Sequence, residues 1–385
     1  MQKKTAVSIF FLALGIFDAI TTEIGMIAVL PQLSRRFDVD PSQAGYLVSL
    51  FALVVAVSGP FLTLLFSGMN RKKVLLAAML MFAVSNVVYA YAASFELMLV
   101  FRVHPALFHP LFFSIAITSA AGLVPPAQIR KAVTRVMAGV TFGFAFGVPL
   151  TAYLAARFSL EAAFLFGASV TAVAFAGILT VMPSMPGGPR VSFGKQLGVL
   201  RRPAVWLSLA IVVMIFTAMS SVYSYFAEYL NEVTRMGASL ISAMLMVFGI
   251  AMIAGNFLFG FWLSKSVSRT ALWFPAAYAI VYAMLHYGGV RSESLAVIVV
   301  VWGCVHAGGL LVGQALLTSD TAEAPEFGNS LFVSFSNIGI TLGTWIGGLF
   351  IAGWGTPQLA WSGMLASLLA LALIAFRMSV IRKFR

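Results

Sequence analysis

The stretch Gly139-Val-Thr-Phe-Gly143-Phe-Ala-Phe-Gly147-Val-Pro149 places a glycine at every fourth position of an otherwise apolar run. Residues four apart share one face of an α-helix, so this pattern predicts a helix that another helix can approach closely. We expect the face to pack across an interface between two halves of the protein. The same glycine ladder returns 200 residues later, at Gly339, Gly343 and Gly347. The chain is therefore expected to contain two copies of one structural unit.

The composition indicates a membrane protein built from helices. Of the 385 residues, 61% are hydrophobic and 9% are charged, whereas about a quarter of a typical soluble domain is charged. The apolar residues form continuous runs close to the roughly 20 residues that a spanning helix needs, without the alternation typical of membrane-spanning strands. The predicted fold class is an all-α polytopic membrane protein.

Twelve apolar runs are long enough to be membrane spans. They cover residues 7–31, 44–66, 74–93, 97–120, 135–156, 162–182, 204–229, 239–263, 270–288, 295–317, 329–353 and 358–376. The first run follows Lys3 and Lys4 but has no small-residue cleavage site, so it is expected to be an uncleaved first helix.

The positive charge predicts the topology. With the N-terminus inside, 18 of the 24 Lys and Arg residues fall in segments on the cytoplasmic side and five on the other side. Because basic residues concentrate in cytoplasmic loops, both termini are expected in the cytoplasm, and the net charge of +12 does not indicate nucleic-acid binding.

A loop divides the chain into two halves. Residues 184–203 contain Pro-Gly-Gly-Pro followed by basic residues, which predicts a cytoplasmic linker between a six-helix half at 1–183 and a second at 204–385. A shift of 197 residues places Phe51 on Phe248 and His109 on His306, so the repeat extends beyond the glycine ladders.

Several local motifs resemble the major facilitator superfamily. The run Leu-Val-Phe-Arg102-Val-His-Pro-Ala-Leu-Phe-His109 is similar to the fourth-helix arginine motif of its proton-driven antiporters, and Gly147-Val-Pro149 looks like their fifth-helix signature. Together with Thr22-Glu23 in the first span, these motifs resemble the sugar, arabinose and purine nucleoside efflux branch of the drug:proton antiporters. The loop after the second span departs from the family pattern, with Ser67 in place of an acid.

Charged residues inside the spans are the candidates for coupling, since a charge at midbilayer costs about 2.5–3.5 kcal/mol on insertion scales. They are Asp18, Glu23, Arg102 and Glu228. Asp18 and Glu23 lie about 140° apart around a helix and cannot share a face. Glu23 is the expected proton carrier because it occupies the position that matches the family's Thr-Glu motif. The alternative is that Glu23 pairs with Arg102 as a static brace.

Two histidines are further candidates. His109 lies two turns after Arg102 and has a side chain that titrates near neutral pH, so it is expected either to relay protons or to serve as a hydrogen-bonded packing residue. His306 is a candidate because it occupies the position in the second half that corresponds to His109 in the internal repeat.

A set of polar and aromatic residues in the second half is expected to contact substrate, because their polar atoms need partners in hydrocarbon or must line a cavity. The set is Glu228, Tyr225, Trp302, His306, Gln314 and Asn337. An aromatic belt at the membrane interface is the alternative for the tyrosines near Glu228.

No metal or cofactor is expected. The four histidines include no pair three or four residues apart, Cys304 is the single cysteine, and no phosphate-binding glycine loop or hydrolase motif is present.

The sequence therefore predicts a monomeric, non-enzymatic exporter in the bacterial inner membrane, whose partners are protons, lipid and a small organic solute such as a sugar, nucleoside or drug. Alternating access between two halves is the expected mechanism. Two alternatives are a proton-independent facilitative or uptake carrier and a transporter-fold receptor or scaffold.

Overall fold

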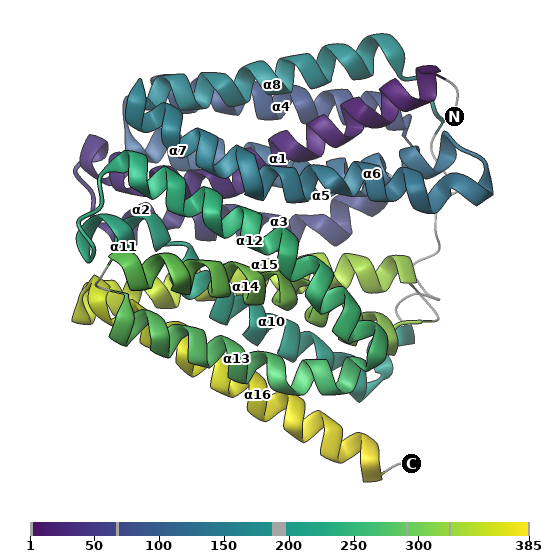
Figure 1. The fold of residues 1–385 in the computed structure, drawn as a ribbon. Helices are drawn as coiled ribbons and strands as arrows, with labels where there is room; N and C mark the ends of the chain where they lie inside the picture. Colours follow the sequence, from purple (N-terminus) through teal and green to yellow (C-terminus); the bar gives the residue numbers. More distant parts are fainter. Residues whose placement is uncertain (1–2, 67–68, 187–197, 290–291, 323–324, 384–385) are drawn as a thin grey trace.

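The computed structural model describes residues 3–66, 69–186, 198–289, 292–322 and 325–383, and these residues form helices joined by short turns, with no strand among them (Figure 1). Both chain termini lie at the same end of the bundle (Figure 1). We call this the terminal end and the opposite one the distal end. Most of the expected linker, residues 187–197, lies outside the described residues.

The helices of the first part of the chain pack against one another. They are α1 (Lys3–Phe37), α2 (Pro41–Ala44), α3 (Tyr46–Leu65), α4 (Arg71–Tyr91), α5 (Phe95–Gly122), η1 (Pro126–Gln128), α6 (Ile129–Phe142), η2 (Gly143–Gly147), α7 (Val148–Arg157) and α8 (Leu160–Val181).

The helices of the second part form the lower group in Figure 1. They are η3 (Gly198–Arg201), α10 (Pro203–Tyr223), α11 (Phe226–Glu232), α12 (Ala238–Lys265), α13 (Val267–Gly288), α14 (Ser292–Asp320), α15 (Pro325–Trp354), η4 (Thr356–Gln358) and α16 (Leu359–Lys383).

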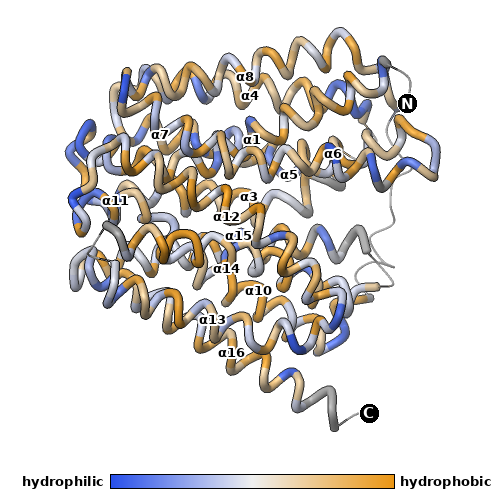
Figure 2. Tube along the Cα trace, viewed as in Figure 1, coloured by the Kyte–Doolittle hydropathy of each residue, from blue (hydrophilic) through white to orange (hydrophobic). Residues whose placement is uncertain are grey.

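The long helices match the twelve expected spans in order. Among the described residues, eleven are long and apolar enough to cross a membrane, with α6, η2 and α7 forming one of them. The ninth expected span, 270–288, corresponds to α13, which has 22 residues but is not among the eleven. Hydrophobic residues follow the helices through the middle of the bundle, and hydrophilic residues gather at its ends (Figure 2). This arrangement fits a bilayer that crosses the middle of the bundle.

The glycine ladders pack inside each part of the chain and not across an interface between halves, which corrects the expectation from the sequence. A Cβ added at Gly139 would lie 2.3 Å from the main-chain oxygen of Ala13 on α1. One added at Gly343 would lie 2.5 Å from that of Thr217 on α10. Each ladder therefore allows main-chain contact between the first and fifth spans of its own part.

The contacts of the two ladders repeat along with the sequence. The residues that approach the first ladder include Ala13, Phe17 and Thr21, and those that approach the second include Val213, Thr217 and Ser221, each 200 positions later. The rings of Phe51 and His109 meet edge to face at 5.6 Å, and those of Phe248 and His306 do so at 5.1 Å. The internal repeat thus appears in three dimensions as equivalent contacts.

A π-helical turn interrupts the fifth span. Pro149 has no N–H to donate to the carbonyl four residues before it, and the chain forms η2 immediately upstream. The widened turn faces α12, where a Cβ on Gly249 would lie 2.5 Å from Ala145 Cα. Ser242 Oγ donates a hydrogen bond to the Pro149 carbonyl at 2.7 Å. Pro149 and η2 therefore form a contact between the two parts.

A second set of contacts joins the two parts near the distal end. Thr341 Oγ1 on α15 donates to the Ser49 carbonyl on α3. Tyr225 lies where α10 meets α11, and its ring packs against both Gly45 and Gly348. Its hydroxyl donates to the Thr344 carbonyl at 2.9 Å. These close approaches hold the two parts together on the distal side of the bundle.

Candidate functional site

Glu23 and His109 meet in the interior, on α1 and α5. His109 Nε2 lies 3.0 Å from Glu23 Oε2, within ion-pair distance though without the angles of a hydrogen bond. Both side chains are almost buried, with about 7% of the histidine and 10% of the glutamate side chain exposed. The contact is an ion pair only when the imidazole is protonated and the carboxylate is not. Protonation of either residue therefore changes the charge balance of the site.

Arg102 does not pair with the Glu23 carboxylate, which corrects the brace considered from the sequence. The guanidinium is fully buried, and each of its nitrogens donates a hydrogen bond of 2.8 Å to a main-chain carbonyl. The acceptors are Leu47 on α3 and Thr22 and Glu23 on α1. The side chain also lies 4.3 Å from the centre of the Phe51 ring, a cation–π contact. Arg102 thus ties α5 to α1 and α3 through main-chain carbonyls and does not pair with the Glu23 carboxylate.

Aromatic rings surround His109. The ring of Phe113 lies 4.6 Å away, that of Phe51 5.6 Å and that of Phe82 6.5 Å, measured between ring centres. Neither ring nitrogen of His109 has a hydrogen-bond partner among the described residues. The imidazole is therefore positioned by packing, and Glu23 is its closest ionisable neighbour.

Asp18 lies on another face of α1, as the helical spacing predicts. It is fully buried against α8, where Thr171 Oγ1 donates a hydrogen bond of 2.6 Å to its Oδ2. Its Oδ1 has no hydrogen-bond partner among the described residues. One turn along the same seam, Asn86 Nδ2 donates to Thr22 Oγ1. Asp18 therefore belongs to a polar seam inside the first part of the chain, apart from the Glu23–His109 pair.

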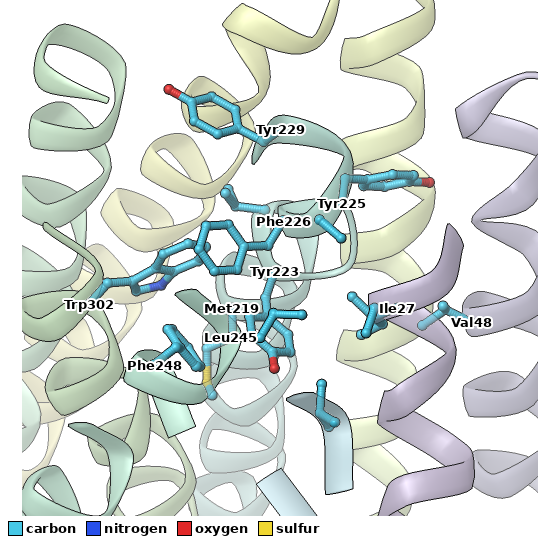
Figure 3. Close-up of a cluster of buried hydrophobic side chains, with 14 of the residues drawn as sticks. Ile27, Val48, Met219, Tyr223, Tyr225, Phe226, Tyr229, Leu245, Phe248 and Trp302 are labelled. Carbon is cyan, nitrogen blue, oxygen red and sulfur yellow. The ribbon is translucent and has the colours of Figure 1, made fainter. Parts of the chain in front are cut away.

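An aromatic cluster in the second part of the chain contains two of the expected substrate contacts, Trp302 and His306. Tyr223 stacks on Phe248 with ring centres 4.8 Å apart, and Phe226 meets Trp302 edge to face at 4.7 Å. Figure 3 shows the rings of Tyr223, Phe226, Phe248 and Trp302 grouped opposite Ile27 of α1. Ile27 lies one helical turn beyond Glu23, so α1 connects the carboxylate with the aromatic cluster.

A hydrogen-bonded chain fixes the orientation of His306. Trp302 Nε1 donates to Tyr278 Oη at 3.1 Å, and Tyr278 Oη lies 2.6 Å from His306 Nδ1. The indole can only donate, whereas donor and acceptor between the tyrosine hydroxyl and Nδ1 depend on the tautomer of His306. Tyr278 therefore engages Nδ1 of His306, and Nε2 has no hydrogen-bond partner among the described residues. The site thus contains an imidazole nitrogen, Nε2 of His306, beside aromatic faces.

Two other expected substrate contacts, Tyr225 and Glu228, lie toward the distal end. Tyr225 takes part in the contact between the two parts of the chain described above. Glu228 is buried on α11, near Glu232 and Arg35, and its Oε2 has no hydrogen-bond partner among the described residues. Glu232 Oε2 in turn accepts a hydrogen bond from Thr356 Oγ1. The structure places this carboxylate pair at the distal seam between α1 and α11.

The last two expected substrate contacts are Gln314 and Asn337. Neither forms a hydrogen bond with the aromatic cluster among the described residues. Gln314 is exposed on α14, and its Nε2 donates weakly to Asn329 Oδ1 at 3.4 Å. Asn337 is buried on α15 and donates to the Val333 carbonyl of its own helix. His104 is exposed and contacts the Val100 carbonyl one turn earlier. No group of three metal-binding side chains occurs in the part of the chain that the structure describes.

A comparison with protein families matches residues 11–324 to the Major Facilitator Superfamily. The chain belongs to this superfamily. It is a multi-pass membrane protein and a secondary transporter, with no enzymatic activity expected of it. The resemblance of its motifs to this superfamily is therefore confirmed, at the level of the superfamily.

Similar proteins align with this chain over nearly its whole length. It is 29% identical over 364 residues to the inner membrane transport protein YdhP of Escherichia coli K12, covering 94% of each chain. It is 26% identical to YfhI of Bacillus subtilis 168, described as an uncharacterized MFS-type transporter, covering 92% of this chain and 89% of the other.

Solved structures share the fold of this transporter. The nucleoside transporter NupG superimposes with a TM-score of 0.78 at 13% identity, covering 97% of this chain and 99% of the other. A peptide transporter, POT, superimposes with a TM-score of 0.80 at 12% identity, covering 97% and 94%. At such identities the likeness establishes the fold alone.

Sequence reasoning missed several residues of the site. Tyr278 connects Trp302 with His306, yet nothing in its local sequence separates it from an ordinary apolar-face tyrosine. Thr171 was missed as the partner of Asp18, because the two are 153 positions apart. Asp320 was also missed; it accepts hydrogen bonds from Ser208 and Arg377 and links α14 to α10 and α16 near the terminal end. An acidic residue at the end of an apolar run was the available signal for Asp320.

Proposed function

We propose that this transporter exports a small organic solute in exchange for protons, with Glu23 as the proton carrier. The observation that carries the proposal is the contact of Glu23 Oε2 with His109 Nε2 at 3.0 Å in the interior of the membrane protein. An intramembrane carboxylate that is not neutralised by a permanent cation can bind and release a proton.

The hydrogen bonds of Arg102 support this assignment. A carboxylate paired with a guanidinium would resist protonation. Arg102 instead donates its hydrogen bonds to main-chain carbonyls. Glu23 is left with a histidine, which is charged only when its imidazole is protonated. In our proposal proton binding to Glu23 breaks its attraction to a protonated His109 and loosens α1 from α5.

Asp18 has a secondary role in this proposal. Its carboxylate is fully buried, bonds to Thr171 and faces α8, a helix of the same part of the chain. A proton on Asp18 would therefore have no direct effect on the aromatic cluster of the second part. We assign Asp18 to the packing of α1 on α8 and Glu23 to coupling.

The aromatic cluster supports the solute-binding part of the proposal. Tyr223, Phe226, Phe248 and Trp302 offer ring faces, and His306 Nε2 offers a polar atom for hydrogen bonding. Ring faces with a few fixed polar groups are typical of sites for small molecules that combine apolar and polar surface. We propose a sugar, a nucleoside or purine, or an amphiphilic drug as the solute class.

Alternating access would follow from the arrangement of the two parts of the chain. We propose residues 1–183 and 204–385 as the moving halves, with the terminal end in the cytoplasm of the cell and the protein in the inner membrane as a monomer. The contacts of Tyr225, Thr341 and Ser242 between the two parts would open and close in each cycle.

The test is transport by purified protein in liposomes with an imposed pH gradient. A solute is first chosen by screening sugars, nucleosides and lipophilic cations for thermal stabilisation of the protein. Wild type and Asp18→Asn are expected to couple solute flux to the gradient, while Glu23→Gln still binds the solute but loses gradient-driven flux at least about tenfold. Coupling that persists in Glu23→Gln and disappears in Asp18→Asn would reverse the assignment. Equal flux with and without the gradient in wild type would indicate a facilitative carrier.

A further inference from the structure

A cavity outside the transport site opens at the corner between α12 and α13. It has a volume of about 440 Å³ and lies where α12 ends and α13 begins, at the terminal end of the bundle (Figure 1). Its lining consists of Trp262, Lys265, Ser266, Arg269, Thr270 and Trp273. The wall therefore combines two cations, two indoles and two hydroxyls, with no acidic residue.

The two cations of this corner cavity have no acidic partner among the described residues. Neither Lys265 nor Arg269 forms an ion pair with an acid in the part of the chain that the structure describes. Lys265 Nζ lies 4.1 Å from the centre of the Phe261 ring instead. Arg269 is exposed, and its main-chain N–H donates a hydrogen bond to the Ser266 hydroxyl oxygen. Two unpaired cations beside one cavity favour an anionic ligand.

The equivalent corner of the first part of the chain gives an internal comparison. The shift of 197 residues that relates these helices places Lys72 opposite Arg269. Lys72 Nζ donates to the carbonyls of Leu179 and Met182 at the end of α8. Its charge is thus used to hold a helix end, whereas Arg269 has no such partner among the described residues. The corner cavity is therefore not a general consequence of the repeat.

The other walls of the corner cavity match the boundary between headgroups and acyl chains. The rings of Trp262 and Trp273 meet edge to face at 5.0 Å, and tryptophan is enriched at this level of the bilayer. Ser266 caps the first turn of α13, and its hydroxyl proton remains available to a ligand oxygen. Leu258 and Phe261 precede Lys265 on the same face of α12. The exposed fraction is 46% for Leu258 and 56% for Phe261.

We propose that the corner cavity binds the phosphodiester headgroup of an anionic phospholipid, whose acyl chains lie along Leu258 and Phe261. Lys265, Arg269 and the Ser266 hydroxyl contact the phosphate, and the two indoles pack against the glycerol region. A lipid fits better than free phosphate because the cationic wall continues directly into an exposed apolar strip. This inference does not depend on the transported solute or on proton coupling.

Native mass spectrometry of the purified full chain tests the proposal. The protein is titrated with phosphatidylglycerol and, separately, with phosphatidylcholine of the same acyl chains. The test variant is Lys265→Gln with Arg269→Gln. The matched control is Lys73→Gln with Lys131→Gln, which removes the same charge from exposed residues in the first turns of α4 and α6. A third arm adds inorganic phosphate in large excess to the phosphatidylglycerol complex.

Wild type and control are expected to prefer phosphatidylglycerol over phosphatidylcholine by about fivefold or more, since each basic side chain near anionic lipid contributes a gain of that order. The preference should fall close to one in the Lys265→Gln, Arg269→Gln variant. An unchanged preference in that variant, or an equal fall in the control, would overturn the site. Displacement of the lipid by inorganic phosphate would show that free phosphate is the ligand.

Discussion

The Glu23 carboxylate contacts His109 Nε2 at 3.0 Å, while Arg102 Nη2 donates a hydrogen bond to the main-chain carbonyl of the same glutamate at 2.8 Å. The guanidinium of Arg102 is thus hydrogen-bonded to the backbone of Glu23, whereas the imidazole of His109 contacts its carboxylate. This division separates the residue that fixes the position of α1 from the residue that can respond to a proton. It also yields distinct predictions for variants of Arg102 and His109.

Arg102→Lys is expected to lower stability and to weaken transport. The guanidinium donates to carbonyls on two helices at once, and a single ammonium cannot reproduce that fork. Loss of such charge-assisted bonds should cost about 1.5–3 kcal/mol, read as a lower thermal unfolding midpoint in detergent. Arg102→Met, which removes the charge as well, is the comparison. If the lysine variant equals wild type in both midpoint and flux, the fork is unnecessary.

His109→Gln is expected to reduce coupling more than solute binding. Glutamine keeps a polar side chain near Glu23 but cannot change its charge, so the carboxylate loses its titratable partner. The measurement is solute-induced proton release into weak buffer, alongside solute affinity from thermal shift. His104→Gln is the control, because His104 is exposed on the same helix, contacts the Val100 carbonyl and the Phe101 ring, and forms no ion pair with an acid among the described residues. Proton release that is normal in His109→Gln would limit this histidine to packing.

Gly347→Ala is expected to destabilise the second part of the chain. The new Cβ would lie 2.1 Å from the Ser221 carbonyl oxygen, so α15 and α10 must separate. Overpacking of this kind typically costs about 1–3 kcal/mol. Gly353→Ala on the same helix is the matched control, since its Cβ would meet nothing within 4 Å. Equal unfolding midpoints for the two variants would contradict the role of the ladder.

Tyr278→Phe and Tyr223→Phe are expected to differ in their effects. Removal of the Tyr278 hydroxyl leaves Trp302 Nε1 and His306 Nδ1 without their partner, which should lower stability by about 1–3 kcal/mol. The Tyr223 hydroxyl has no hydrogen bond among the described residues, so its loss should leave the unfolding midpoint unchanged. A fall in solute affinity in Tyr223→Phe would place this hydroxyl against the solute. A lower unfolding midpoint in Tyr223→Phe than in Tyr278→Phe would contradict the hydrogen bonds of Tyr278.

A covalent link between Ser49→Cys and Thr341→Cys, made in a Cys304→Ala background with a short thiol-reactive crosslinker, is expected to stop transport reversibly. These positions join α3 to α15 through the hydrogen bond of Thr341 to the Ser49 carbonyl. Alternating access requires such distal contacts to open. A cleavable crosslinker should restore flux on reduction, and each single cysteine variant should be unaffected. Full flux in the crosslinked protein would show that the two parts need not separate there.

The sequence by itself determined the membrane class, the order of the helices and the internal repeat, because these depend on local hydropathy and on spacing along one chain. The glycines of the ladders could be recognised as a close-packing face, and Asp18 and Glu23 could be assigned to different faces of one helix. Such conclusions require only helical geometry and the cost of burying polar groups.

Only the tertiary structure decided which surfaces meet. A ladder of glycines fits any helix that can approach it, so the sequence could not choose α1 and α10 over an interface between halves. Arg102 and Glu23 attract each other at long range, yet the neighbouring carbonyls and His109 provide closer partners for both. Thr171 and Tyr278 acquire their roles from residues far away in the chain. Partner choice among buried polar groups depends on distances of a few ångströms, which only the packed bundle sets.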